Sequence, residues 1–202
     1  MQQGSIVLLN GAPRSGKSSI AQAMQQREEV WINLGVDNYM RCIPARYQPG
    51  IGLRPGGERP DLEPVVEKLY LALYQSLLAH SRQGINTVVD IGHHDNYSAP
   101  LYLFARCAQI IAQLPVMVVG VYCPVDIIMQ RRVATWHANY SQGDAVPAPV
   151  LRWQQSVHAL GIYDLRVDTS QNTPEECAAQ IEKALLAGGP FGAIKRIAAL
   201  AP

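Results

Sequence analysis

The chain has 202 residues, of which 48% are hydrophobic and 16% are charged, and its formal net charge is +1. This length allows one domain with a full core, with or without a small lid. The near-neutral charge argues against a protein that binds nucleic acid through a strongly basic surface. The four cysteines, Cys42, Cys107, Cys123 and Cys177, form no CxxC pair. We therefore expect no zinc site or disulfide framework, and a reducing cytoplasm as the compartment.

The first part of the chain predicts two buried strands around a helix. Residues 1–4 carry no basic leader and the apolar run after them is short, so no signal peptide or membrane span is expected. A strand at 5–10 is followed by a helix at about 17–27 and a strand at 30–34. Residues 44–60 are rich in Pro and Gly, which predicts an irregular excursion or a hairpin.

The middle of the chain continues the alternation of helix and strand. Asp61 has the character of a helix cap, with Pro64 in the first turn and an apolar stripe that runs to Leu78. The apolar run 87–91 predicts a third strand, and 97–113 a further helix.

The last part of the chain completes the pattern. We expect a strand at 116–122, a helix from about 125 towards 136, a polar segment at 139–149, a helix near 150–158 and a strand at 164–168.

These elements predict a single α/β domain over residues 1–202. Thr173 begins a further helix, because a cap, a proline and an acidic first turn follow one another there. Strands that alternate with helices indicate a mainly parallel, five-stranded sheet covered on both faces. We expect a small helical lid at about 125–150 and a substrate-side excursion at about 44–62. The tail at 188–202 is rich in Gly and Ala, and its role is open.

A phosphate-binding motif follows the first strand. Residues 11–18 fit GxxxxGK[ST] without a mismatch, and a chance match is expected in on the order of 1% of such chains. The motif predicts a three-layer P-loop NTPase fold in which Lys17 reaches the β- and γ-phosphates of ATP and Ser18 binds Mg²⁺. The residues expected to hold the nucleotide are Gly11, Ala12, Pro13, Arg14, Ser15, Gly16, Lys17, Ser18 and Ser19.

Two aspartates follow predicted strands at the edge where ligands gather in parallel sheets. Asp90 ends the third strand, where a second acidic residue commonly joins Ser18 around Mg²⁺. Asp37 follows the second strand, where a carboxylate could accept a proton from a hydroxyl that attacks the γ-phosphate. Either aspartate could instead cap a turn or a helix.

Taken together, these residues give a pattern that resembles the chloramphenicol phosphotransferase family, P-loop kinases with a nucleoside-monophosphate-kinase-like fold. The similarity extends over most of the chain, and outside the phosphate loop it depends on order and spacing. The stretches that carry it are 6–11, 15–18, 34–37 with Pro44, 56–57, 88–90, 119–123, Arg131, 157–158 and 163–169.

The resemblance implies roles for individual residues. Asp37 would be the general base for the acceptor hydroxyl, and Arg131 would neutralise charge on the transferring phosphoryl group. Lys17 and Ser18 would handle the phosphates and the metal. Without the resemblance, Arg131 could also be a solvated helix residue.

The sequence departs from the family pattern in the predicted lid and beside Asp90. Residues 133–140 lack the further arginine and acidic residues of the family lid. Trp136 and His137 could stack on a ring or pack the lid against the body. His93, His94 and Asp95 follow Asp90, and we expect them to line a substrate pocket, because two adjacent histidines on a loop lack the tetrahedral set of ligands that zinc requires.

The 45–60 segment is more basic than the resemblance implies. Tyr47, Arg54 and Arg59 could favour a polar or anionic acceptor over chloramphenicol, or could simply belong to a solvent-exposed loop.

The sequence therefore predicts an enzyme that moves the γ-phosphoryl group of ATP, with Mg²⁺, onto a hydroxyl of a small molecule. The acceptor could resemble chloramphenicol, with antibiotic resistance as the role, or be a nucleoside or another metabolite. The other reading is a switch protein that binds ATP without catalysis. Phosphorylation of nucleic-acid 5′ ends is disfavoured by the charge, no membrane partner is expected, and a homo-oligomer is open.

Overall fold

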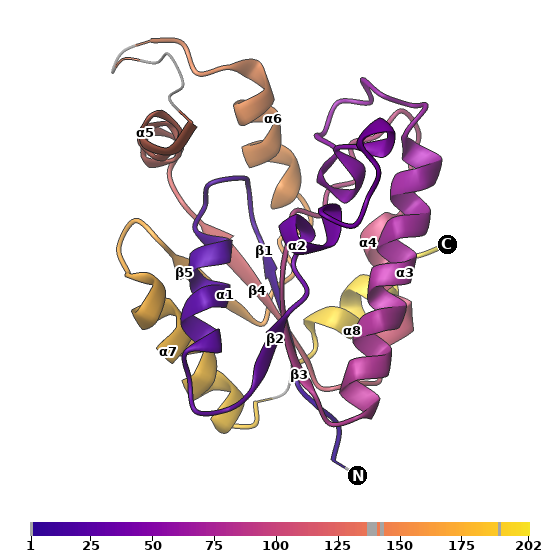
Figure 1. Ribbon diagram of the computed structural model, residues 1–202, viewed down its shortest axis with the longest axis vertical. Helices are drawn as coiled ribbons and strands as arrows, with labels where there is room; N and C mark the ends of the chain where they lie inside the picture. Colours follow the sequence, from indigo (N-terminus) through magenta and orange to yellow (C-terminus); the bar gives the residue numbers. More distant parts are fainter. Residues whose placement is uncertain (1, 137–140, 142–143, 190) are drawn as a thin grey trace.

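Five parallel strands form one central sheet. The structure, a computed structural model, describes residues 2–136, 141, 144–189 and 191–202. The sheet has the strand order β2-β3-β1-β4-β5, and each neighbouring pair is parallel (Figure 1). The strands are β1 (Ile6–Asn10), β2 (Trp31–Asn33), β3 (Asn86–Ile91), β4 (Val116–Tyr122) and β5 (Leu165–Asp168). The predicted five-stranded sheet is confirmed.

Helices cover both faces of the sheet. One face carries α1 (Lys17–Gln25) and α7 (Pro174–Leu186), and the other carries α3 (Glu63–Arg82), α4 (Leu103–Ile111) and α8 (Ala193–Ala198) (Figure 1). This is the predicted three-layer arrangement.

The alternation of side chains along β1 explains why two cores form. Ile6 and Leu8 pack with the core on the α3 side, whereas Val7 and Leu9 pack with the core on the α1 side. All four side chains are fully buried, as expected for a central parallel strand whose neighbours follow through crossover helices.

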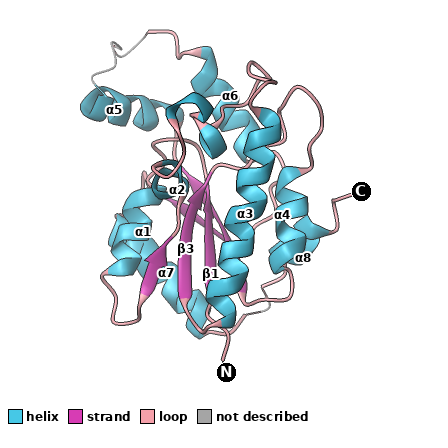
Figure 2. Cartoon of the chain, turned by 45° about the vertical axis from the view of Figure 1, so that its right-hand side comes forward, coloured by secondary structure: helices cyan, strands magenta, loops and turns pink. Residues whose placement is uncertain are grey.

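The remaining helices lie beyond the carboxyl ends of the strands. They are α2 (Val36–Met40), α5 (Val125–Trp136) and α6 (Ala148–Val157), and α5 and α6 stand above the sheet in Figure 2. The last two helices occupy most of the predicted lid. The side chain of Trp136 and the whole of His137 lie outside the described residues. None of the helices in the described part of the chain is long and apolar enough to span a bilayer.

Of two predictions about local structure near residue 60, the cap at Asp61 is wrong and the irregular excursion, given as an alternative to a hairpin, is found. Asp61 does not cap α3, whose N-cap residue is Leu62, because its carboxylate pairs with Arg59 at 2.7 Å instead. The described excursion contains no hairpin, but two short 3₁₀ helices, η1 (Ala45–Tyr47) and η2 (Gly50–Gly52).

The helix predicted to begin at residue 97 begins at Leu103. Ser98 lies in a loop, where its backbone N–H and its hydroxyl both donate to the buried carboxylate of Glu63. A contact between residues 35 positions apart therefore holds this segment out of the helix, and local periodicity carries no signal of it.

The tail is part of the core. Ala193, Ile194 and Ile197 of α8 are buried with α4, and Asp164 anchors the start of the helix. One oxygen of Asp164 accepts hydrogen bonds from the backbone N–H groups of Gly192 and Ala193, and the other from that of Val118, all at 2.9 Å.

Asp164→Asn is therefore expected to destabilise the protein by about 1–3 kcal/mol, because an amide can accept at only one of these two positions and loses the charge. Chemical denaturation of the variant and of Asp126→Asn, which changes an exposed aspartate on α5, measures the difference. Equal stability of the two variants would contradict the role of Asp164 as an anchor.

Candidate nucleotide and acceptor site

The phosphate loop connects β1 to α1 in a backbone conformation that requires glycine. Gly16 has φ 98° and Arg14 has φ 68°, both in the left-handed region. A Cβ atom at Gly11 would lie 2.5 Å from the carbonyl oxygen of Val121, so a larger residue would displace the loop from the sheet. Lys17 folds over this loop, and its Nζ donates to the carbonyl oxygens of Gly11 and Ala12 at 2.8 and 2.9 Å.

A cleft with a volume of about 640 Å³ opens beside the loop, within the usual range for small-molecule sites. Seven of the nine predicted nucleotide-binding residues line it, together with Asp37, Asp90 and Arg131. Ala12 and Ser15 do not, because their side chains are 2% and 1% exposed beneath the loop. The structure therefore brings the predicted catalytic and metal-binding residues to one cleft.

Ser18, at the start of α1, and Asp90, at the end of β3, place two oxygen atoms that could bind a metal ion side by side. The hydroxyl of Ser18 donates to Asp90 Oδ2 at 2.6 Å. Hydroxyl and carboxylate oxygens suit Mg²⁺, so this pair fits the predicted ion. Gly35 makes room for Asp90, since a Cβ at position 35 would lie 1.4 Å from Asp90 Oδ1. This role of Gly35 was not predicted, although Gly35 directly precedes the helix that carries Asp37.

Arg131 lies against the phosphate loop. Its guanidinium donates to the carbonyl oxygen of Arg14 at 3.2 Å, and to the hydroxyl and carbonyl oxygens of Thr169 at 3.0 and 2.7 Å. Thr169 in turn donates its hydroxyl to the carbonyl oxygen of Ser15 at 2.7 Å. Arg131 and Thr169 therefore hold the loop in its left-handed turn. This role of Thr169 was not predicted, although Thr169 directly follows β5 and lies in the stretch 163–169 that carries the family resemblance.

Burial of Lys17 changes its protonation. Desolvation lowers the pKa of Lys17 to about 8, against the opposing effect of the Asp90 and Asp37 carboxylates, which favour the charged amine. Lys17 is thus mostly charged below pH 8 and loses its proton above it.

Affinity for a nucleotide triphosphate is therefore expected to weaken by up to about tenfold per pH unit above pH 8, because only the ammonium form of Lys17 attracts the phosphates. Titration of a non-hydrolysable ATP analogue with Mg²⁺ between pH 7 and 9.5 measures the trend. Lys17→Met serves as the control and should bind weakly with a nearly flat profile, so parallel profiles for both proteins would contradict the assignment.

The other end of the cleft has mostly apolar walls. Val36 and Met40 of α2, Ile51 of η2 and Trp153 of α6 line it, and Asp37 is the charged group on this side. Trp153 packs over Gly92, where a Cβ would lie 3.1 Å from its ring.

His94 supports this wall from outside the cleft. Its ring meets that of Trp153 edge-on, with 5.2 Å between centroids. Its Nδ1 accepts from the backbone N–H of Asn96 at 3.2 Å, so Nε2 carries the proton and donates to the carbonyl oxygen of Leu53 at 2.9 Å. Burial lowers the pKa of His94, which keeps it neutral. The prediction that His93 and His94 line the substrate pocket is not met in this cleft, because neither lines it.

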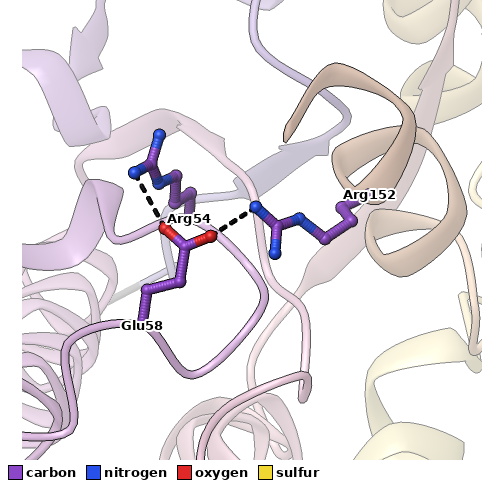
Figure 3. A network of polar contacts seen from close by, with 3 residues as sticks. All are labelled: Arg54, Glu58 and Arg152. Carbon is purple, nitrogen blue, oxygen red and sulfur yellow. Dashed lines mark hydrogen bonds and ion pairs between the residues drawn. The ribbon is translucent and has the colours of Figure 1, made fainter. Parts of the chain in front are cut away.

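The basic residues of the excursion contact neighbouring side chains outside the cleft. Glu58 pairs with Arg54 at 2.8 Å and with Arg152 of α6, so it connects the excursion to α6 (Figure 3). Arg59 pairs with Asp61. The ring of Tyr47 lies beneath the Arg46 guanidinium, 4.7 Å from the ring centroid.

The sequence leaves two interpretations open for Tyr47, Arg54 and Arg59, and the structure favours the surface loop over a contribution to acceptor binding. None of the three lines the cleft, and each contacts a neighbour instead: Arg54 pairs with Glu58, Arg59 pairs with Asp61, and Tyr47 packs against Arg46.

A glycine-rich phosphate loop at the carboxyl edge of a parallel three-layer sheet defines a P-loop α/β protein. The family model described as "Chloramphenicol phosphotransferase-like protein" matches residues 4–186. The chain belongs to this family.

Individual relatives are distant. Two Mycobacterium tuberculosis proteins, from strains CDC 1551 and H37Rv, are named "Putative O-phosphotransferase" and are 24% identical to the chain, with 91% of this chain and 83% of each relative covered. Among solved structures, the Mycobacterium tuberculosis APS kinase in complex with AMPPNP and APS has a TM-score of 0.63 and 17% identity, over 92% of this chain and 99% of that one. Shikimate kinase from Acinetobacter baumannii has a TM-score of 0.58 and 14% identity, over 93% and 96%. These structures share the fold.

Proposed function

We propose that the protein is an ATP-dependent O-phosphotransferase that moves the γ-phosphoryl group onto a hydroxyl of a small, neutral molecule. The observation that carries the proposal is the position of Asp37 in the first turn of α2, in the same cleft as the phosphate loop and close enough to act on the charge of Lys17. The family and the kinase relatives support a phosphoryl transfer of this kind.

In the proposed reaction the chain positions two substrates for in-line transfer. The backbone N–H groups of residues 14–18 and the Lys17 ammonium bind the phosphates of ATP. Asp37 accepts the proton of the acceptor hydroxyl while the new P–O bond forms and the bond between the γ-phosphorus and the β–γ bridging oxygen breaks, which releases ADP. Arg131, held by Thr169, adds positive charge beside the loop.

Mg²⁺ would be held by Ser18 and Asp90, where it would screen the charge of the phosphates. Asp90 is 6% exposed, and Ser18 already orients one of its oxygens. A divalent cation at this point would balance the buried carboxylate that now faces only one hydroxyl and the Lys17 ammonium.

A neutral acceptor with an apolar body suits the other half of the cleft. Val36, Met40, Ile51 and Trp153 offer apolar and aromatic surface. Arg54 and Arg59 of the excursion pair with Glu58 and Asp61, which do not line the cleft. An anionic acceptor would be repelled by the Asp37 carboxylate, whereas the lining cations Arg14, Lys17 and Arg131 belong to or contact the phosphate loop, where ATP would bind. A compound such as chloramphenicol, with hydroxyls on a neutral aromatic body, is one candidate.

The experiment is to measure ADP release from ATP and Mg²⁺ over a panel of acceptors: chloramphenicol, other neutral hydroxylated aromatics, nucleosides, sugars and anionic hydroxy acids. Release that depends on a neutral acceptor, with the phosphorylated product found by mass spectrometry, is the expected result. Tight ATP binding with no acceptor-dependent release over the whole panel would instead favour an ATP-binding switch.

Glu58 is expected to set the position of Trp153 through its pair with Arg152. Glu58→Gln should raise the KM for the acceptor about two- to fivefold and leave the KM for ATP unchanged, because exposed ion pairs are each worth about 0.2–1 kcal/mol. Arg54→Met is the matched control, since it removes only the ion pair between Arg54 and Glu58, which lies within the excursion. A change in the KM for ATP alone would contradict this role of Glu58.

A further inference from the structure

Gly35 lies where two parts of the nucleotide cleft meet. It follows β2 and directly precedes α2, the helix that carries Asp37. A Cβ atom at this position would lie 1.4 Å from Oδ1 and 2.6 Å from Cγ of Asp90. Atoms that are not bonded cannot approach so closely, so the Asp90 carboxylate occupies the space that any other side chain at position 35 would need.

The backbone at Gly35 does not itself require glycine. Its φ of −60° and ψ of 164° lie in the extended region that every residue type adopts. Gly16 in the phosphate loop is different, because its φ of 98° is in the left-handed region. Position 35 therefore requires glycine for its lack of a side chain, and the space left free is taken by a carboxylate.

Hydrogen bonds to the sheet hold the backbone at Gly35 in place. Asn33 pairs with Val88 of β3, and the N–H of Leu34 donates to the carbonyl oxygen of Val88 at 3.1 Å. The N–H of Gly35 donates to Oδ1 of Asn33 at 2.8 Å. Val88 and Asp90 belong to the same strand, so the pairing of β2 with β3 sets the distance between Gly35 and the backbone of Asp90. An added Cβ atom would therefore displace the Asp90 side chain more readily than the backbone.

Ser18 holds the Asp90 carboxylate on its other side. The Ser18 hydroxyl donates to Oδ2 at 2.6 Å, while Oδ1 faces Gly35, and Asp90 is 6% exposed. Since an aspartate side chain is short, a carboxylate that moves away from Gly35 also takes Oδ2 away from Ser18. The two oxygen atoms that suit Mg²⁺ therefore stay together only while position 35 has no side chain.

The same glycine begins the helix that carries Asp37. The carbonyl oxygen of Gly35 accepts from the N–H of Tyr39 at 3.0 Å, which closes the first turn of α2. The Asp90 and Asp37 carboxylates both oppose the lowering of the Lys17 pKa, which places them near the same ammonium group. Gly35 is therefore the contact through which Asp90 and Asp37 are placed relative to one another.

We propose that Gly35 is a positioning residue for the divalent cation, because it lets Asp90 lie against the turn before α2 and keeps Asp90 and Asp37 in one fixed arrangement. This role rests on the proposed function, in which Ser18 and Asp90 hold the cation. It adds that a residue without a side chain sets the affinity for the cation and the place of the general base.

Gly35→Ala tests this role through nucleotide binding, without catalysis. Titration calorimetry gives the dissociation constant of AMPPNP with and without Mg²⁺, and the ratio of the two constants reports the contribution of the cation. In Gly35→Ala this ratio is expected to fall close to one, because substitutions that misplace metal ligands typically cost about 10–100-fold in metal affinity. AMPPNP without Mg²⁺ should bind as it does to the unmodified protein.

Gly192→Ala is the matched control for the exchange of a glycine. A Cβ atom at Gly192 would meet no other atom within 4 Å, and the N–H groups that bind Asp164 are kept. Gly192→Ala should therefore leave the ratio of the two AMPPNP dissociation constants unchanged.

The Asp90→Ala background separates positioning from a general loss of stability. Asp90→Ala removes the carboxylate, so a Cβ atom at position 35 keeps only its 2.9 Å contact with Oδ1 of Asn33. Gly35→Ala is therefore expected to lower the melting temperature at least about twice as much in the unmodified protein as in Asp90→Ala, since residues in contact are not additive. This comparison holds even if Gly35→Ala alone is too unstable for calorimetry.

Three outcomes would overturn the proposal, and they can be told apart. If Mg²⁺ tightened AMPPNP equally in Gly35→Ala and in the unmodified protein, Gly35 would have no positioning role, while the proposed function would stand. Equal losses of melting temperature in both backgrounds would show that the added Cβ does not act through Asp90. If Mg²⁺ had no effect on AMPPNP binding to the unmodified protein, Ser18 and Asp90 would not hold the cation, and this part of the proposed function would fail first.

Discussion

Asp37→Asn is expected to reduce turnover by about 10²–10⁴-fold and to leave the dissociation constant for ATP nearly unchanged. The amide keeps the size of the side chain at the start of α2 but cannot take the proton of the acceptor. Asp37 is exposed in the cleft and, within the described part of the chain, accepts no hydrogen bond from the phosphate loop, so the loop should keep its shape. Steady-state kinetics with a neutral acceptor, together with titration of AMPPNP, separate the two effects.

The matched control for Asp37→Asn is Glu182→Gln, which neutralises a carboxylate on α7 that pairs with Arg27 and does not line the cleft. Glu182→Gln should turn over like the unmodified protein. If Asp37→Asn lost ATP binding and turnover together, Asp37 would be a structural residue of the loop. If it kept full turnover, another group would have to take the proton.

The sequence predicts the sheet and the phosphate loop well because both depend on local patterns. Each strand is a short apolar run between turn residues, and all five predicted runs form strands, with ends that differ by a few residues. The GxxxxGK[ST] pattern encodes its own backbone geometry, since Gly16 adopts a positive φ. Asp37 and Asp90 could be placed in the same cleft because the carboxyl ends of parallel strands share one edge.

The features that the sequence did not predict depend on long-range contacts. Thr169 supports the phosphate loop across 154 positions through its bond to Ser15, and no spacing rule connects the two. The same holds for the tail, whose helix is fixed by Asp164, and for the late start of α4, which follows from the contact between Glu63 and Ser98. In each case a single polar side chain satisfies backbone groups far away in the chain, which apolar periodicity cannot reveal.

The role of the charged residues in the excursion could not be decided from the sequence for a related reason. Composition alone assigns free positive charge to Arg54 and Arg59, whereas the fold pairs them with Glu58 and Asp61. The pairing with Arg152 also depends on Gly56, since a Cβ there would lie 2.7 Å from the Arg152 guanidinium. Glu58 therefore joins the excursion to α6 through Arg152 (Figure 3). Ile51 of the excursion contributes to the apolar wall of the cleft.

Lys17→Ala is expected to lower kcat/KM for ATP by about 10²–10³-fold, whatever the acceptor, because it removes a desolvated cation from the site where charge develops on the transferring group. Lys17 also donates to the carbonyl oxygens of Gly11 and Ala12, so part of the loss could come from the loop itself. The pH profile separates these causes: the lost charge matters below pH 8, where Lys17 is protonated, whereas a disordered loop weakens binding at every pH.

Lys68→Ala, at an exposed position on α3, is the control for the loss of one positive charge and should behave as the unmodified protein. Turnover of Lys17→Ala close to that of Lys68→Ala would refute the assignment of the loop to the nucleotide phosphates. If Lys17→Ala instead raised only the KM for the acceptor, Lys17 would contact the acceptor and not the phosphates of ATP. The proposed division of the cleft between Lys17 and Asp37 would then be wrong.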